Sequence, residues 1–277
     1  MTGRRVARGV FLNGSAVLVF AAMFFPVYWM ISTAFKPGRD ILRLTPKWFP
    51  SPATLANFGD AIHRPYFWSD VKNSLIVVGA VVGASLLLAF LAAVAIARFR
   101  FYGRRAFIAV IIGVQMVPLN ALIIPLFLQL ARLGQVNKLT GVIVTYLTFV
   151  LPFTVWTLRG FVMGVPRELE EAAVVDGCTR LGAFRRILLP LIAPGLVATS
   201  IFAFIQAWNE YVLAYVLLQS PEKQTLTVWL ASFTTVRGTD WGPLMAAATL
   251  TALPVVVFFM LVQRRVAFGL TAGAVKG

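Results

Sequence analysis

The chain has 277 residues, of which 59% are hydrophobic and only 13% charged, and its mean hydropathy is +0.83. About a quarter of the residues in soluble domains are charged, so this composition excludes an ordinary soluble protein and indicates one that spans a membrane. The formal net charge of +15 would suggest nucleic-acid binding in a soluble protein. Here the arginines gather at the ends of apolar segments, where basic residues set topology and contact lipid head groups. With one cysteine, Cys178, and one histidine, His63, the sequence allows no internal disulfide and supports no metal or haem site.

Six apolar segments are each close to, or longer than, the roughly 20 residues that a bilayer requires. They cover residues 10–34, 74–97, 106–130, 139–158, 188–218 and 244–262. The basic start followed by an apolar segment could be a signal peptide, but the segment is about twice the usual apolar length and lacks a clear cleavage site. We therefore predict an uncleaved first span and an all-α, polytopic bundle of six transmembrane helices that forms a single domain over residues 1–277.

The two ends of such a bundle lie on one side of the membrane. Placing them in the cytoplasm puts more of the 25 lysines and arginines on the inner side than on the outer side, as the positive-inside rule expects, although the bias is modest. Prolines inside the spans remove backbone donors and favour kinks. These are Pro118, Pro125, Pro152 and Pro254.

A charged segment, residues 163–190, separates the fourth and fifth spans, and from Glu168 to Pro190 it reads ELEEAAVVDGCTRLGAFRRILLP. Pro166 and the glutamates that follow it are typical of a helix amino terminus. Gly177 supplies a turn or a cap. A second, basic helical piece is expected after the glycine, and Pro190 ends it where the next span begins.

The spacing in this segment resembles the EAA loop of the membrane subunits of ABC importers: Glu-Ala-Ala, three residues, Gly, nine residues, Ile, one residue, Leu-Pro. The matching residues are Glu171, Ala172, Ala173, Gly177, Ile187, Leu189 and Pro190, with Asp176 beside the glycine. The resemblance implies the type I importer permease fold and a cytoplasmic coupling helix that docks on an ATPase subunit. The alternative is an amphipathic helix that lies on the membrane surface.

The fifth span carries a polar group within an apolar segment: Trp208, Asn209, Glu210 and Tyr211. About 20 helical residues at about 1.5 Å each place Glu210 roughly 30 Å from Pro190, towards the outer leaflet. A carboxylate within the bilayer costs about 2.5 to 3.5 kcal/mol, so we expect it to face the bundle interior and to have a partner. This WNEY segment also resembles the carbohydrate branch of the permeases. It either lines the translocation pathway or clamps helices together.

The last residues, 263–277, are too short to fold alone. Their ending is similar to the carboxyl terminus of the maltose-type inner permease, which implies contact with the ATPase pair. The residues concerned are Gly269, Leu270, Thr271, Gly273, Lys276 and Gly277. A tail without a partner is the alternative.

Over nearly the whole chain, the resemblance is thus to the carbohydrate branch of binding-protein-dependent ABC importer permeases. It implies a multi-pass subunit in a bacterial or archaeal cell membrane with both termini cytoplasmic. The implied partners are a dimer of ATP-binding subunits, a second and different permease, and an extracytoplasmic solute-binding protein, with membrane lipids around the bundle and no nucleic acid.

The chain itself is expected to be no enzyme, with no catalytic residue, metal or cofactor. Gly177 and Gly182 have the separation of Walker-loop glycines, but Ala183 and Phe184 stand where Lys and Ser or Thr must bind phosphate and magnesium. ATP and Mg²⁺ therefore belong to the partner ATPase. Two alternatives stay open at this point: a proton-coupled secondary transporter that uses Glu210, and an importer of glycerol phosphate or polyols rather than sugars.

Overall fold

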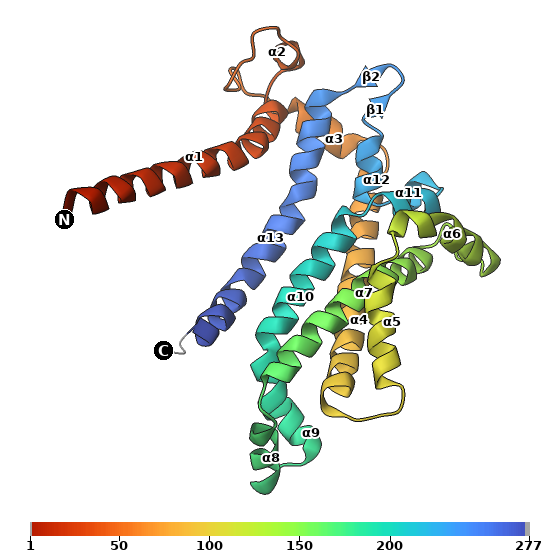
Figure 1. Cartoon of the computed structure of the whole chain (residues 1–277). Coiled ribbons are helices and arrows are strands. Elements are labelled where there is room, and N and C mark those ends of the chain that lie inside the picture. The colour runs from red at the N-terminus through yellow and green to blue at the C-terminus, as the bar shows by residue number, and fades with distance from the viewer. Residues whose placement is uncertain (1, 275–277) are drawn as a thin grey trace. The chain divides into compact units, whose positions relative to one another are not determined.

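The structure is a computed structural model that describes residues 2–274, with side chains placed for residues 9–263 (Figure 1). The described chain is almost entirely helical, and its strands are the antiparallel pair β1 (Thr234–Thr235) and β2 (Gly238–Thr239). It divides into two compact units. Of the described residues, 2–67 and 230–254 form the first, and 68–229 and 255–274 form the second.

Five described helices are long and apolar enough to cross a membrane. A bent pair of helices gives a sixth span if the pair is counted as one. The all-α, multi-span fold predicted from the composition is thereby confirmed. The five are α1 (Thr2–Ala34), α4 (Phe67–Arg98), α7 (Leu139–Gly164), the continuous helix Arg180–Asn209, and α13 (Trp241–Ala274).

The third expected span, 106–130, is the bent pair. It consists of α5 (Arg104–Gln115), the short helix η1 (Leu119–Leu122) and α6 (Ile123–Arg132), with a bend of 96°. The bend lies where Pro118 adopts an extended conformation, with φ −64° and ψ 124°. Proline offers no N–H donor and disfavours helical geometry in the residue before it, so the helix ends here. Pro152 and Pro254 lie inside continuous helices instead.

The fifth span differs from the expected 188–218 at both ends. Its helix begins at Arg180, as α9 (Arg180–Ala183), a π-helical turn (η2, Phe184–Leu188) and α10 (Leu189–Asn209). The basic piece after Gly177 is therefore the first turns of the span and not a separate helix. The helix ends at Asn209, and a short helix α11 (Val212–Leu217) follows Glu210.

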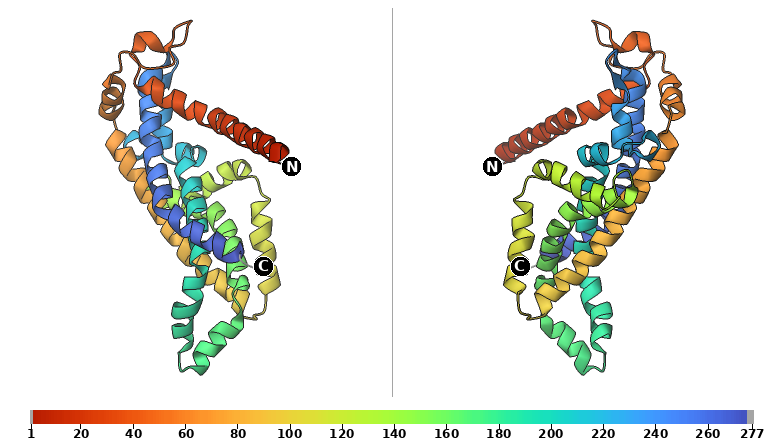
Figure 2. Two further views of the ribbon diagram at one scale, coloured as in Figure 1. Left: turned by 90° about the vertical axis from the view of Figure 1, so that its left-hand side faces the viewer. Right: turned by 90° about the vertical axis from the view of Figure 1, so that its right-hand side faces the viewer.

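The core of the second unit lies among α4, α5, α7 and α10, which run close together in Figures 1 and 2. Small residues let the helices approach closely, as is usual where packing and not hydrophobicity drives association in lipid. Its most buried members are Ala89 and Ala93 of α4, Leu158 and Val162 of α7, Leu188 of η2 and Ile192 of α10. At Gly195 the approach is closest, because a Cβ atom there would collide with the ring of Phe161 on α7.

In the first unit, the connection after α1 is packed on its own residues through α2 (Gly38–Ile41) and α3 (Ala56–His63). The Lys36 ammonium lies 3.9 Å from the centroid of the Trp29 ring and is only 2% exposed, and this burial lowers the pKa of Lys36. The Asn57 amide donates hydrogen bonds to the carbonyl oxygens of Ala34 and Lys36 at 2.9 and 2.8 Å. The hydrogen bond from Lys47, at 2.8 Å, holds the pKa of Asp40 below its usual value.

Replacing Gly195 by alanine should lower stability by about 1 to 3 kcal/mol, because the new methyl group overpacks the contact with α7. Gly160→Ala is the matched control, since a Cβ at Gly160 meets no atom within 4 Å and alanine is the better helix former. Thermal unfolding of the two detergent-purified variants measures the difference. Equal melting temperatures would show that α7 and α10 do not meet as described.

Candidate functional site: the α8 segment and the Glu210 break

The charged segment after α7 forms the helix α8 (Arg167–Val175), with Pro166 at its N-cap and Glu168 and Glu170 in its first turn. This is the helix start predicted from the sequence. Negative side chains stabilise a helix amino terminus, where unpaired N–H groups carry partial positive charge. Figures 1 and 2 show α8 and α9 at one end of the second unit.

The turn after α8 depends on Gly177, whose φ of 90° is in the left-handed region. The N–H of Gly177 donates to the Val174 carbonyl at 3.0 Å, and the N–H of Cys178 donates to the Ala173 carbonyl at 2.9 Å. This pair of hydrogen bonds is a Schellman motif, which satisfies the last carbonyls of a helix and favours glycine. Gly177 therefore acts as the cap that the sequence predicted.

Thr179 begins the next helix, a role that the sequence reasoning missed. Its Oγ1 accepts a hydrogen bond from the N–H of Gly182 at 3.1 Å, so it is the N-cap of α9. A threonine just after a capping glycine was the available signal.

Two arginines connect this segment to the end of α4. The Arg98 guanidinium forms an ion pair with Glu170 of α8 at 2.7 Å and donates a hydrogen bond to the Val165 carbonyl at 2.9 Å. Arg167 donates in the other direction, to the carbonyl oxygens of Ala97 and Arg98 at 2.9 and 3.1 Å. The Arg98 side chain is only 11% exposed, so the pair is shielded from water. The last two carbonyls of α4, those of Ala97 and Arg98, are thus satisfied by Arg167 of α8.

The motif residues divide by exposure. Glu171, Ala172, Asp176 and Gly177 are exposed, Ala173 is buried, Ile187 and Leu189 are half-buried, and Pro190 is exposed in the first turn of α10. Beside them Val175 is 87% exposed at the tip of α8. A groove of about 510 Å³ lies between α8, the end of α4 and α9, and both Glu170 and Glu171 line it. Arg167 and Arg180 line the groove as well, so the segment presents a face with acidic, basic and apolar side chains.

Glu210 interrupts the fifth span by capping α11. Its carboxylate accepts hydrogen bonds from the N–H groups of Leu213 and Ala214 at 2.8 and 3.0 Å. The Tyr146 hydroxyl of α7 donates to it at 2.6 Å, and the Thr227 hydroxyl donates to its backbone carbonyl at 2.8 Å. The predicted partner for this carboxylate is therefore a tyrosine together with a helix amino terminus. The carboxylate links α7 to the start of α11.

The residues next to Glu210 in the sequence lie in different surroundings. Trp208 is only 4% exposed, and its ring stacks on Phe204. Asn209 is exposed, with its amide donating to the Ile205 carbonyl at 3.0 Å, and Tyr211 is 38% exposed. The WNEY residues thus differ in exposure and in the partners that they contact.

Asparagines that the sequence reasoning passed over hold the connection after α11. The Asn73 amide donates to the carbonyls of Glu222 and Gln224 at 3.1 and 3.0 Å, and the Ser74 hydroxyl accepts from the N–H of Leu226 at 2.8 Å. The side chain of Asn137, a residue with a φ of 60°, exchanges two hydrogen bonds with Ser220. Asparagine tolerates this backbone region better than most residues, which was the only local signal.

The carboxyl-terminal tail continues α13 as far as Ala274. Gly269, Leu270, Thr271 and Gly273 thus belong to a helix, although their side chains lie outside the described ones, as do Lys276 and Gly277 altogether. In the described part of the chain, no group of three or more His, Cys, Asp or Glu side chains is placed to hold a metal ion.

Comparison with known proteins identifies the family. Residues 85–271 match the model of the family described as binding-protein-dependent transport system inner membrane component. The diacetylchitobiose uptake system permease protein DasC of Streptomyces coelicolor is 48% identical, over 97% of each chain. The trehalose transport system permease protein SugB of Mycobacterium tuberculosis is 36% identical, over 94% of this chain and 95% of SugB.

This chain belongs to that permease family. The permease is therefore a multi-pass inner-membrane subunit of a binding-protein-dependent ABC importer, and the ATPase partner binds the ATP. Family membership also means that the permease is no enzyme, and it decides against the proton-coupled alternative.

The permease also has the fold of a solved relative. A chain from the crystal structure of a bacterial ABC transporter involved in the import of the acidic polysaccharide alginate matches it with a TM-score of 0.82 and 22% identity, over 95% of this chain and 98% of that chain. At this level of identity the likeness concerns the fold.

Arg98→Gln should loosen α8, because Glu170 loses its ion-pair partner and the Val165 carbonyl its donor. A hydrogen bond to a charged group contributes about 1.5 to 3 kcal/mol. Faster hydrogen exchange of the α8 amides, measured by mass spectrometry, is the expected result. Arg185→Gln, at an exposed arginine of the neighbouring helical turn, should leave that exchange unchanged. Unchanged exchange in Arg98→Gln would contradict the anchoring role.

Glu210→Ala should lower stability by about 1 to 2 kcal/mol, because α11 loses its cap. Tyr146→Phe should cost less, and the double variant should be less destabilised than the sum of the two because they share one hydrogen bond. Thermal unfolding of all three variants measures the coupling. Melting temperatures equal to that of the unmodified permease would show that Glu210 has no clamping role.

Proposed function

We propose that α8 is the coupling helix of this importer, and that the subunit passes ATP-driven movements of an ATPase into the bundle through Arg98 and Arg167. The observation that carries this proposal is the two-way connection between α8 and the end of α4. A helix that only rested on the membrane would need no such anchor. The exposed Glu171 and Val175 remain available on the same helix to contact another protein.

Each residue of the segment then has a distinct task. Glu171 and Val175 meet the ATPase, with Ala172, Asp176 and Gly177 beside them. Ala173 packs inward, Gly177 and Thr179 set the turn, and Ile187, Leu189 and Pro190 continue the movement into α10. When ATP closes the ATPase pair, α8 moves with it, and Arg98 draws α4 along. α4, α7 and α10 share a core, so they respond together.

The arginines at this end of the second unit indicate on which side of the membrane α8 lies. Arg98, Arg100, Arg104 and Arg105 lie at the α4–α5 connection, and Arg98 contacts α8 directly. Basic residues favour the cytoplasmic side. We therefore infer that α8 and both termini are cytoplasmic, and that residues 269–277 meet the ATPase pair.

The complete importer that we propose contains two ATPase subunits, a second and different permease, and an external solute-binding protein. The substrate is a carbohydrate or a related solute, because the relatives named above are permeases for diacetylchitobiose and for trehalose. In this complex the exposed Asn209 and Tyr211 are the pathway candidates, and Glu210 and Trp208 hold the break that positions them.

Extraction of the tagged permease from its native membrane in mild detergent, with mass spectrometry of the copurifying proteins, tests the composition. We expect an ATPase, a second multi-span permease and a binding protein. The binding protein is then titrated with sugars, glycerol phosphate and polyols, and tight binding of a non-carbohydrate would overturn the substrate class. Recovery of the permease as a homomer, under conditions that preserve other membrane complexes, would overturn the proposed partners.

Glu171→Lys should leave the permease inserted but lower ATP-driven uptake by tenfold or more, on the order of 1.4 kcal/mol of lost coupling. The reversed charge alters the surface that meets the ATPase. Glu168→Lys reverses an exposed glutamate one turn earlier on α8 and serves as the matched control, with uptake near normal. Uptake of solute into membrane vesicles supplied with ATP is the measurement. Normal uptake by Glu171→Lys would exclude this residue from coupling.

A further inference from the structure

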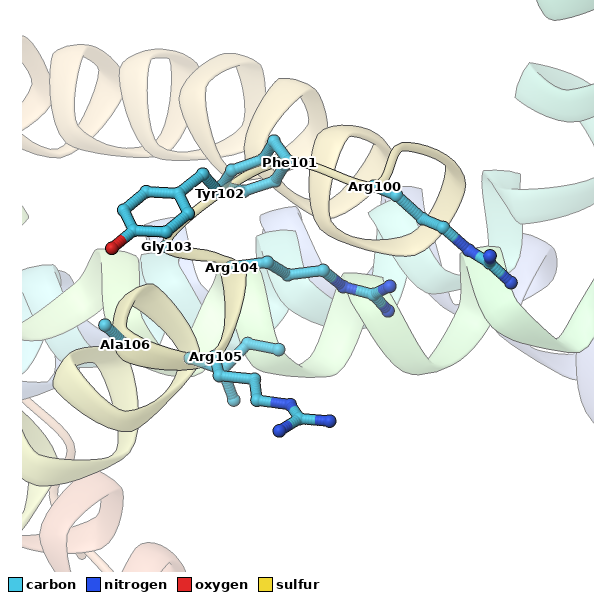
Figure 3. A pocket seen from close by; sticks show the side chains of 8 residues that line it. Arg100, Phe101, Tyr102, Gly103, Arg104, Arg105 and Ala106 are labelled. Atoms are coloured by element: carbon cyan, nitrogen blue, oxygen red, sulfur yellow. The ribbon is translucent and has the colours of Figure 1, made fainter.

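The short connection between α4 and α5 gathers three arginines that the coupling segment does not use. α4 ends at Arg98 and α5 begins at Arg104, so Arg100, Arg104 and Arg105 all lie at the ends of membrane-spanning helices. In Figure 3 their guanidinium groups extend towards the same side of the loop. Gly103, with a φ of 85°, makes the sharp turn that places Arg100 beside the other two.

No carboxylate neutralises these arginines in the described part of the chain. Arg98 has Glu170, whereas Arg100, Arg104 and Arg105 form no ion pair there. A hollow of about 630 Å³ opens beside them, and no acidic residue lines it. The three arginines line it together with Phe101, Tyr102 and Ile108. The site therefore offers positive charge and apolar surface at once.

Exposed aromatic rings share the short connection with the arginines, and Phe101 and Tyr102 line the same hollow. Phe99 is 57% exposed and Phe101 is 44% exposed, while Tyr102 is fully exposed, with its hydroxyl directed away from the guanidinium groups (Figure 3). Aromatic residues at the ends of membrane spans favour the interface between head groups and acyl chains. Such rings give acyl chains a surface next to a charged head group.

We propose that the α4–α5 connection binds one anionic phospholipid, with its phosphate held by Arg100, Arg104 and Arg105 and its acyl chains against the exposed rings. The planar guanidinium group donates paired hydrogen bonds to phosphate oxygens, so three unpaired arginines match this anion well. A lipid fits better than free phosphate because the apolar lining would otherwise face water. A lipid also fits better than an acidic protein surface, because the five-residue connection keeps the arginines close to the two spans.

The proposed lipid lies next to the residue that anchors α8 to α4. Arg100 is two residues beyond Arg98, which ties α4 to Glu170. A phospholipid bound there steadies the end of α4 on which α8 is anchored. This binding site stands on the geometry of the loop alone and does not depend on the coupling role of α8.

The test uses the full permease, purified with its copurifying subunits and examined by native mass spectrometry against phosphatidylglycerol and phosphatidylcholine. We expect one retained phosphatidylglycerol, held at least about tenfold more tightly than phosphatidylcholine. Each Arg→Gln change should weaken it about fivefold, and the triple variant Arg100→Gln, Arg104→Gln, Arg105→Gln by on the order of a hundredfold. Single variants answer the question if the triple variant does not fold.

Matched controls separate this site from general charge effects. A second triple variant, Arg39→Gln, Arg132→Gln, Arg237→Gln, removes equal charge from exposed arginines elsewhere and should retain the lipid. Equal retention of phosphatidylcholine, or unchanged binding in the first triple variant, would overturn the proposal. So would displacement of the lipid by millimolar inorganic phosphate, which would indicate a free-anion site. Loss of the ATPase without loss of lipid would assign the arginines to a protein contact.

Discussion

The structure depends most on one interaction, the polar contact between the end of α4 and α8. The Arg98 guanidinium forms an ion pair with Glu170 at 2.7 Å and donates a hydrogen bond to the Val165 carbonyl at 2.9 Å. Arg167 of α8 donates hydrogen bonds to the last two carbonyls of α4. These contacts tie α8 to α4, in addition to the packing of α8 on α9 and η2. A charged pair that is largely shielded from water is costly to separate, so α8 and α4 are expected to move together.

The other end of the second unit uses polar side chains in the same way. Glu210 caps α11 while it accepts the Tyr146 hydroxyl, and Asn73 and Asn137 hold the connection that follows. Broken helices within membrane proteins need such partners, since unpaired backbone groups are costly there. Glu210 thus serves the architecture of the break, and the pathway residues are to be sought among its exposed neighbours.

Local chemistry explains what could be predicted from the sequence. The start of α8, the cap at Gly177 and the bend at Pro118 each follow from residues within a few positions of one another. The Arg98–Glu170 pair joins residues far apart in the chain, and nothing near Arg98 indicates its partner. The helix of the fifth span begins and ends at other residues than expected, because Thr179 was not taken as an N-cap and because Glu210 was assumed to continue the helix.

The central claim is that α8 contacts the ATPase and moves with it. Val175 is 87% exposed at the tip of α8, and Cys178 is the only native cysteine. A Val175→Cys variant in a Cys178→Ser background therefore offers a single cross-linking site in the assembled importer. The account predicts a cross-link from this site to the copurifying ATPase whose yield changes when ATP is bound. A site that reacts instead with a lipid-soluble reagent and forms no cross-link to the ATPase would contradict it.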